Sequence, residues 1–248
     1  MSHHRFICQV IVPMCVGEPA AMLSHQNTSP NCAPRAPRCL SHGDDTHSSS
    51  MLNAENLVVP LQSIVKPLGL AELFPKAQPL EVELGCGDAS FLVELARRNP
   101  ERNFIGVERL LGRLSKLDRK GRRAGLANLC GVRIESSYFL KYLLPPHSAS
   151  ALHIYFPDPW PKKKHRKYRL IDSRFPALAR AALAPRGAVY LRTDDADYLS
   201  QMVEVFAADE KFREIETPPA LAGLPTDFER DFNSKGIQTL RLAFVTAE

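Results

Sequence analysis

Residues 80–88 read LEVELGCGD, an apolar run that leads directly into a glycine-rich turn. An amphipathic pattern follows over residues 88–99, so the segment has the order strand, tight turn and helix. Glycine lets the backbone turn sharply and approach a ligand, and the N-terminus of the next helix faces the same place. This stretch therefore predicts the first strand–turn–helix unit of an α/β domain, with a ligand site at the turn.

Strand and helix patterns continue to alternate as far as the C-terminus. Further strands are expected at residues 103–108, 132–135, 150–156, 187–193, 212–217 and 237–245, and further helices at residues 109–124, 169–183 and 198–208. This alternation is typical of a doubly wound, mostly parallel α/β sheet, here with seven strands. No helical pattern separates the last two strands, so we expect them to form an antiparallel hairpin at the C-terminal edge of the sheet.

Residues 1–50 are rich in Ser, His, Pro and Asn and have no sustained helix or strand period. We expect them to be a disordered extension and residues 51–248 to form the folded domain. The charges of the extension cancel, so the chain's net charge of +5 belongs to the domain. Four of the six cysteines lie in the extension without the close spacing of zinc ligands, which predicts reduced thiols and no metal site. No apolar run approaches the roughly 20 residues that span a membrane, which favours a cytoplasmic protein.

The glycine-rich turn has the features of a site for a nucleotide-containing cofactor. Gly85 and Gly87 are present, but the third glycine of a dinucleotide-binding motif is missing. Glu108 ends the next strand pattern about twenty residues on, where a carboxylate binds ribose hydroxyls of either NAD or S-adenosyl-L-methionine (SAM). The carboxylates of Glu83 and Asp88 would repel a pyrophosphate but attract the sulfonium and ammonium groups of SAM. The turn therefore favours SAM, and the alternative for Glu83 is a carboxylate that caps the loop.

A second informative stretch, residues 156–169, reads FPDPWPKKKHRKYR. Asp158 lies at the end of the fourth strand pattern, and three prolines hold the backbone around it. The basic residues that follow are interleaved with Trp160, His165 and Tyr168. This combination is typical of a nucleic-acid groove, in which cations bind phosphates and aromatic rings stack on bases. The alternative for such a basic run on its own is a solvated loop or a localisation signal.

The segment FPDPWPKKKH at residues 156–165 resembles the signature of the bacterial tRNA (guanine-N7)-methyltransferases. The resemblance extends over about residues 55–248 and includes VELGCG at 82–87, GVE at 106–108, RTD at 192–194 and TDFER at 226–230. It implies a class I, Rossmann-like methyltransferase fold and SAM as the methyl donor. It also implies that the partner is tRNA and that the target is N7 of a guanine in its variable loop (position 46 in tRNA numbering).

The resemblance assigns roles to individual residues by their place in these motifs. The active-site residue would be Asp158. The SAM site would be lined by Glu83, Gly85, Gly87, Glu108, Glu135 and Asp158. Contacts with the target nucleotide would come from Lys162, Asp194, Thr226, Asp227, Phe228 and Glu229, and contacts with the RNA from Lys163, Lys164, His165, Arg166, Lys167 and Arg169. Family members usually have aspartate where this chain has Glu135, so the alternative there is a structural carboxylate. No metal is expected, and the protein would act as a monomer or a homodimer.

The chemistry expected at the guanine needs no general base. N7 has an in-plane lone pair and no proton at neutral pH, so it can attack a sulfonium methyl group directly, and the protein has to orient the base and place charge. Asp158 could accept hydrogen bonds from the guanine N1–H and amino groups and stabilise the positive charge that develops on the ring. Asp194 and Glu229 are further candidate acceptors, and the alternative for both is a salt bridge with neighbouring lysines and arginines.

Three other functions remain open from the residues alone. The chain could methylate another RNA or a protein, it could be a non-catalytic RNA-binding scaffold, or it could be an NAD-dependent oxidoreductase. The basic stretch favours RNA as the substrate, and the intact glycines and acids of the turn favour catalysis. The missing third glycine disfavours NAD.

Overall fold

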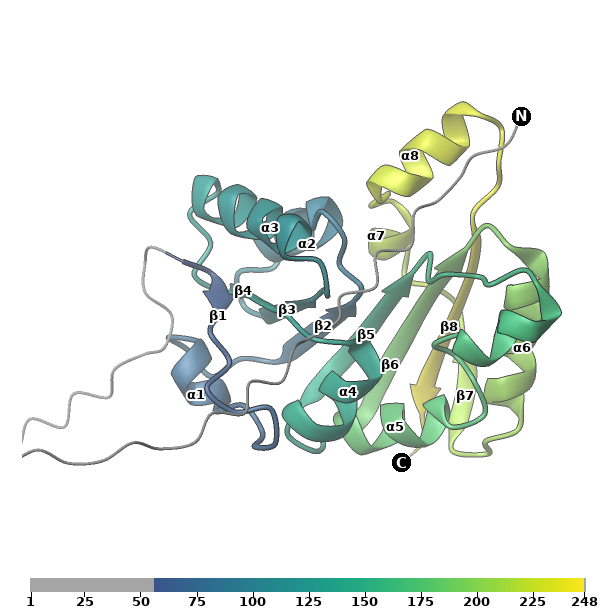
Figure 1. The fold of residues 1–248 in the computed structure, drawn as a ribbon, viewed down its shortest axis with the longest axis horizontal. Helices are drawn as coiled ribbons and strands as arrows, with labels where there is room; N and C mark the ends of the chain where they lie inside the picture. Colours follow the sequence, from purple (N-terminus) through teal and green to yellow (C-terminus); the bar gives the residue numbers. More distant parts are fainter. Residues whose placement is uncertain (1–55, 248) are drawn as a thin grey trace, which may run out of the picture. The chain divides into compact units, whose positions relative to one another are not determined.

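The computed structural model describes residues 56–247, which form a mixed β-sheet with helices on both faces (Figure 1). The predicted extension, residues 1–50, lies outside the described residues. In spatial order the strands are β1 (Val58–Val59), β4 (Leu129–Val132), β3 (Asn103–Val107), β2 (Leu80–Leu84), β5 (Ala149–Tyr155), β6 (Leu183–Thr193), β8 (Leu240–Thr246) and β7 (Phe212–Ile215). Adjacent strands from β1 to β6 are parallel, whereas β8 runs antiparallel to both β6 and β7.

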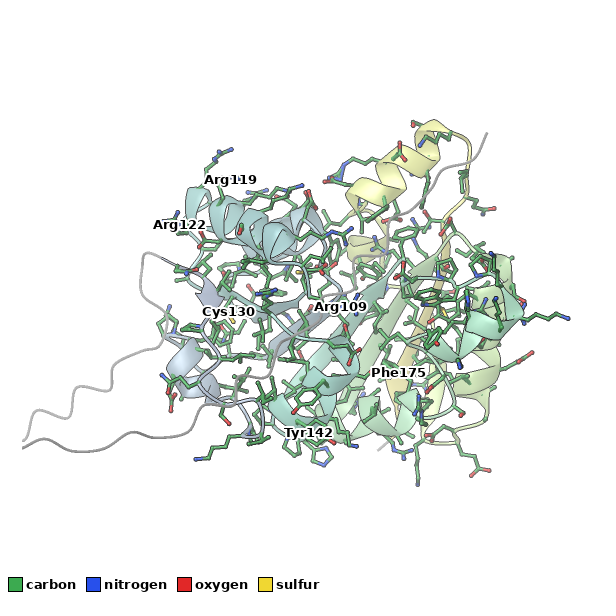
Figure 2. All side chains as sticks on the ribbon, in the orientation of Figure 1. Arg109, Arg119, Arg122, Cys130, Tyr142 and Phe175 are labelled. Atoms are coloured by element: carbon green, nitrogen blue, oxygen red, sulfur yellow. The ribbon has the colours of Figure 1, made fainter. Side chains whose placement is uncertain are left out.

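The helices divide between the two faces of the sheet. α2 (Ser90–Arg98) and α3 (Leu111–Arg123) cover one face, where their leucines pack with Phe104 of β3. The other face is covered by α1 (Leu70–Leu73), the π-helical turn η1 (Phe139–Leu143) that follows the short α4 (Ser136–Tyr138), α5 (Phe175–Ala182) and α6 (Ala196–Ala207). Cys130 of β4 and Phe175 of α5 are both completely buried in this second layer (Figure 2). Helices on both faces of a mostly parallel sheet confirm the doubly wound α/β class.

Two strands differ from the pattern expected from the sequence. β4 lies at Leu129–Val132 instead of residues 132–135, although it contains a glycine, a residue that usually weakens a strand. Gly131 is needed there because α3 packs closely on β4: a Cβ at this position would lie 2.8 Å from the side chain of Leu114. The two-residue β1 pairs with β4 and adds an eighth strand, which is too short to have a recognisable period.

The last two strands are antiparallel as expected, but they do not form a hairpin. α7 (Pro219–Ala222) and α8 (Asp227–Ser234) lie between β7 and β8 along the chain. α8 begins with a capping box, in which the Thr226 hydroxyl accepts from the Glu229 backbone N–H and the Glu229 carboxylate accepts from the Thr226 backbone N–H. The apolar residues of α8 are only Phe228 and Phe232, one helical turn apart, and this short pattern does not by itself predict a helix between the last two strands.

The strand order forms a crevice at the carboxyl edge of the sheet. From β2 the chain moves through β3 to β4 on one side, and it then crosses back to β5 on the other side of β2. Ligands of open α/β sheets bind at such a reversal of strand order, beyond the carboxyl ends of the strands. The turn after β2 and the loop after β5 line a common cavity here, so both motifs that stand out in the sequence lie at one site.

Candidate active site

The turn after β2 leaves its backbone open toward the crevice. Gly85 and Gly87 have φ angles of 79° and 54°, which residues with a side chain rarely adopt. The backbone N–H groups of Gly85 and Cys86 donate to the Val107 carbonyl of β3, at 2.8 and 3.0 Å. No atom lies within 4 Å of the position that a Cβ on Gly85 would take. The turn is therefore held by β3 and has open space for a ligand beside it.

Glu83, near the end of β2, is a buried carboxylate with an unpartnered oxygen. The residue is 4% exposed, and its Oε2 atom has no hydrogen-bond partner within residues 56–247. Burial raises the pKa of Glu83 to about 8; Arg192 opposes the rise, and the carboxylates of Asp88 and Glu108 add to it. Glu83 lines a cavity of about 370 Å³. An unpartnered carboxylate oxygen in a cavity wall fits the cationic group of a ligand such as SAM.

A second cavity, of about 580 Å³, shares Gly85 with the first. Its wall includes three carboxylates that were expected at the cofactor site: Glu108, Glu135 and Asp158. Glu108 is buried directly after β3 and accepts a hydrogen bond from the Leu110 backbone N–H at 2.9 Å, which fixes its orientation. The carboxyl ends of β3, β4 and β5 thus bring these acids to one crevice.

Glu135 has partners at the start of its own helix. It is exposed, and its two carboxylate oxygens accept from the backbone N–H groups of Ser137 and Tyr138 at 2.9 and 2.8 Å. Glu135 therefore caps α4, which favours the structural alternative for this residue. It also borders the second cavity, so a cofactor contact there would have to share these oxygens.

Asp158 follows β5 on a constrained loop. Phe156 and Trp160 on either side of it have φ angles of 51° and 44°, and the Phe156 backbone N–H donates to the Arg192 carbonyl at 2.8 Å. Such backbone conformations are strained at residues other than glycine and cluster at functional sites. The Asp158 side chain is exposed and has no hydrogen-bond partner among the described residues. The loop therefore presents a carboxylate whose oxygens are available to a ligand.

The basic stretch after Asp158 forms the 3₁₀ helix η2 (Lys163–Tyr168). Trp160 packs against His165 and Tyr168, with ring centroids 5.8 and 5.5 Å apart, and both Trp160 and Tyr168 line the second cavity. The exposed cations of this loop are Lys162, Lys163, Lys164 and Lys167. Lysines and aromatic rings are thus combined next to the cavity that Asp158 lines.

Two arginines of the same stretch hold the loop in place. Arg169 is 3% exposed and donates to the Pro159 carbonyl at 2.7 Å, to Gln201 Oε1 at 2.7 Å and to Asp197 at 2.6 Å. Arg166 pairs with the same carboxylate of Asp197 at 2.7 Å. The structure differs from the expectation that Arg169 contacts RNA, because its guanidinium is buried and bound to α6 and to the loop backbone. Arg166 is half-buried and shares this anchoring role.

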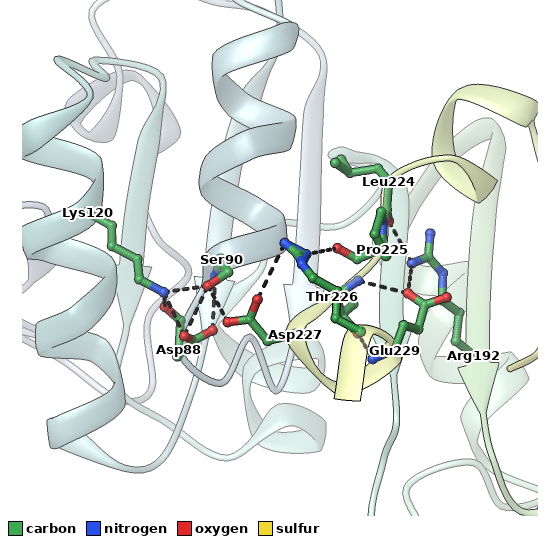
Figure 3. A network of polar contacts seen from close by, with 10 residues as sticks. Asp88, Ser90, Lys120, Arg192, Leu224, Pro225, Thr226, Asp227 and Glu229 are labelled. Carbon is green, nitrogen blue, oxygen red and sulfur yellow. Dashed lines mark hydrogen bonds and ion pairs between the residues drawn. The ribbon is translucent and has the colours of Figure 1, made fainter. Parts of the chain in front are cut away.

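The C-terminal motif at residues 226–229 contains two residues that stabilise α8 (Figure 3). Glu229 is completely buried, and its carboxylate accepts from Arg192 and, at 2.8 Å, from Arg241. Thr226 is also buried and caps the helix. Since both carboxylate oxygens of Glu229 are bound to arginines, the structure favours the salt-bridge alternative over a contact with guanine.

Three residues of this motif, Thr226, Asp227 and Phe228, line the first cavity. Asp227 accepts a hydrogen bond from the Ser90 hydroxyl at 2.7 Å, and the Ser90 backbone N–H donates to Asp88 at 3.1 Å. Asp88 in turn is paired with Lys120 at 2.6 Å. This series of polar contacts connects α8 with α2 and α3 across the cofactor turn (Figure 3).

Tyr155 lines both cavities and was not singled out in the sequence. Its ring lies 4.1 Å from the Arg192 guanidinium, and its hydroxyl is 2.9 Å from Nδ1 of the buried His153. The other ring nitrogen of His153 is 2.8 Å from Glu81. The signal that could have identified Tyr155 is its place as the last residue of the strand that leads to Asp158.

Lys162 and Asp194 are exposed at the carboxyl edge of the sheet, outside the linings of both cavities. Within residues 56–247 there is no group of three or more acidic, histidine or cysteine side chains that could hold a metal ion. In the same part of the chain, no helix combines the length and the apolar character that a membrane crossing requires.

Known proteins match most of the chain. A family model described as "Putative methyltransferase" matches residues 77–242. The tRNA (guanine-N(7)-)-methyltransferase of Halorhodospira halophila is 36% identical over 182 residues, which cover 71% of this chain and 79% of that protein. The protein of the same name from Rubrobacter xylanophilus is 34% identical over 182 residues, 72% of this chain and 81% of that protein.

Solved structures show the same fold at low sequence identity. The 16S rRNA methyltransferase KamB has a TM-score of 0.52 and 17% identity, covering 72% of this chain and 93% of that one. TrmN from Thermus thermophilus has a TM-score of 0.50 and 15% identity, covering 69% of this chain and 45% of that one. Together with the family model and the relatives above, these findings show that the chain belongs to the tRNA (guanine-N(7)-)-methyltransferases, a family whose methyl donor is SAM.

Proposed function

We propose that this chain transfers the methyl group of SAM to N7 of a guanine in the variable loop of tRNA. The observation that carries the proposal is that the two cavities lie side by side and share part of their wall. Glu83, with its unpartnered oxygen, lines one, Asp158 lines the other, and Gly85 belongs to both. One crevice thus offers a site for a cation next to a site for a base. The names of the matching relatives support the same reaction.

The cofactor site would be built from the ends of β2 and β3. SAM supplies an electrophilic methyl group on a positively charged sulfur. Glu83 would attract the ammonium group of the cofactor, because water does not compete at a buried carboxylate. Glu108 would accept hydrogen bonds from the ribose hydroxyls with Oε2, which it would share with a long ion pair to Arg113 at 3.5 Å. Gly85 and Gly87 would let the nucleoside approach the backbone closely. Glu135 is a secondary candidate here, because its oxygens cap α4.

Asp158 would select and orient the guanine. A carboxylate without a partner can accept hydrogen bonds from both the N1–H and the amino group of guanine, a donor pair that adenine does not offer. The same negative charge would favour the movement of positive charge from sulfur to the purine ring during transfer. Since N7 carries no proton, no side chain has to act as a base.

The basic loop would hold the RNA next to the crevice. Its exposed lysines would bind phosphates, and Trp160 and Tyr168 would stack on a base that has left the RNA stack. Asp227 and Phe228, which line the first cavity, and Lys162 and Asp194, at the same edge of the sheet, would contact the target nucleotide. We propose that the reaction takes place in the cytoplasm and that the protein acts as a monomer or a homodimer.

The direct test is to incubate the purified protein with labelled SAM and an unmodified tRNA transcript. The methylated position is then mapped by chemical cleavage at 7-methylguanine. A single labelled guanine in the variable loop is the expected result. Label in ribosomal RNA or protein but not in tRNA would overturn the assignment of tRNA as the substrate. A protein that neither transfers the methyl group nor binds SAM would favour the non-catalytic scaffold.

A further inference from the structure

A second basic surface lies on α3, outside the motifs used so far. α3 carries six basic residues and one acidic residue, so its net charge of +5 equals that of the whole chain. All remaining residues of the chain are therefore neutral in sum. Lys116, Arg119 and Arg123 are exposed, and none of them forms an ion pair or a side-chain hydrogen bond within residues 56–247.

These three cations form a stripe along the helix. With 3.6 residues per turn, Lys116, Arg119 and Arg123 fall on one side of α3, opposite its buried apolar face. From Lys116 to Arg123 the stripe extends over about 10 Å of helix, at about 1.5 Å per residue. Figure 2 shows Arg119 extending from α3 away from the sheet. An unpaired, continuous array of this kind can contact several phosphates of one strand.

The single acidic residue of α3 does not neutralise the stripe. Asp118 accepts from the Leu57 backbone N–H at 2.9 Å and pairs with Arg122 at 3.2 Å. Like charges three and four residues apart destabilise a helix, and Arg113 in the first turn opposes the helix dipole. On α2, by contrast, the arginines are balanced by Glu94. Lys120, Arg122 and Arg123 lie in the last turn, where positive charge favours the helix dipole, so the unfavourable part of the charge is the repulsion between the unpaired residues of the stripe.

The stripe begins at the crevice that the basic loop also borders. Arg113 lines both cavities and Lys116 lines the first. Trp160 and Tyr168 of the loop line the second cavity. The two basic surfaces therefore come from separate elements, one after β3 and one after β5, and both lead to the same site.

We infer that the α3 stripe, Lys116, Arg119 and Arg123, is a second phosphate-binding surface that holds the backbone of the same tRNA. The inference rests on the proposed function, because it takes the substrate to be RNA. Phosphates are the groups that an array of unpaired cations attracts, with release of counterions. A basic helix that binds a membrane needs a free apolar face, whereas Leu114 and Leu117 are completely buried.

The test is a triple neutralisation, Lys116→Gln with Arg119→Gln and Arg123→Gln. The matched control, Lys66→Gln with Lys76→Gln and Lys211→Gln, removes the same charge from exposed lysines outside both basic surfaces. The tRNA dissociation constant is measured at salt concentrations from about 50 to 200 mM. We expect the stripe variant to bind tRNA roughly tenfold or more weakly, and the slope of log K against log salt to fall by about 2 to 3.

Further measurements separate the possible causes. The Arg119→Gln, Arg123→Gln double variant, which keeps the cavity residue Lys116, should bind SAM like the wild type. The melting temperature of the triple variant should not fall below that of the wild type, since the stripe side chains are exposed. A charge-preserving variant, Lys116→Arg with Arg119→Lys and Arg123→Lys, should retain tRNA binding. An unchanged salt slope in the stripe variant, or the same loss of tRNA affinity in the control variant, would overturn the inference. The proposed function would still hold in that case, provided that the wild-type protein methylates tRNA. A wild-type protein that neither binds nor methylates tRNA would defeat both.

Discussion

At the scale of single residues, Glu83 should make cofactor binding depend on pH. Burial raises its pKa to about 8, so below that pH the side chain is mostly protonated in the free protein. A cation needs the ionised form, so SAM affinity should rise by close to tenfold per pH unit below about 8 and then level off. Calorimetric titration between about pH 6 and 9 measures this. The Glu83→Gln protein should bind SAM weakly and lack the rise, and matching pH profiles of the two proteins would contradict the role.

The same side chain should lower the stability of the ligand-free fold at high pH. The pKa of Glu83 is about 8 in the folded protein and 4.5 in an ordinary environment. The folded state therefore retains a proton that the unfolded state loses, and stability falls as pH rises from about 4.5 to about 8. Glu83→Gln should exceed the wild type in free energy of unfolding by on the order of 5 kcal/mol at about pH 8.5 and match it near about pH 4.5. Urea unfolding at both pH values is the measurement, and a constant difference would refute the linkage.

Asp158 should be required for transfer but not for binding. Asp158→Ala is expected to lower the rate of methylation by roughly 100-fold or more, because the charge that orients guanine and favours the transition state is lost. tRNA affinity should stay within about twofold, since phosphate contacts dominate it. Single-turnover methylation and filter binding of tRNA give the two values. Full activity of the variant would remove Asp158 from the mechanism.

At the scale of elements, α8 depends on a buried ion pair. Glu229 connects the helix to Arg192 of β6 and Arg241 of β8. Loss of one partner leaves buried charge uncompensated, so Glu229→Ala should lower the free energy of unfolding by about 3 kcal/mol. Asp231→Ala, at an exposed position of the same helix, should change it by less than about 0.5 kcal/mol. Urea unfolding compares the two, and equal effects would show that the buried pair does not hold α8.

The regular elements could be predicted from the sequence, and the irregular ones could not. β2, β3 and β5 lie within one residue of their expected bounds, because each is an apolar run of ordinary length with a clear end. β4 was displaced because Gly131 counts against a strand until the close approach of α3 is known. α8 was missed because a capping box and a buried ion pair stabilise it, and neither depends on apolar periodicity.

The candidate site shows a similar division. Glu83, Glu108 and Asp158 were found because they lie at or just beyond strand ends, and parallel strands carry such residues to one edge of the sheet. The family resemblance assigned Glu229 to the target nucleotide and Arg169 to the RNA by their place in its motifs. Their partners are distant along the chain, in α6 and on β6, so only the folded arrangement shows that both are buried.

At the scale of the whole molecule, residues 56–247 supply the sheet and the cavity linings described above. A protein that begins at Met51 should therefore methylate tRNA with the kinetic constants of the full chain, within about twofold. Steady-state methylation by the two proteins, with circular dichroism of each, is the comparison. Loss of folding or activity in the shortened protein would assign residues 1–50 a role that the proposed site lacks.

The concentration of positive charge on α3 and on the basic loop also makes the molecule an electric dipole. A polyanion that approaches this dipole is turned toward the crevice before any contact forms, so productive encounters outnumber random ones. Dissolved ions screen the field beyond about 10 Å, and added salt should therefore slow association more than it hastens release. The unpaired cations of α3, which repel one another, thus make association of the protein with its RNA faster and better oriented.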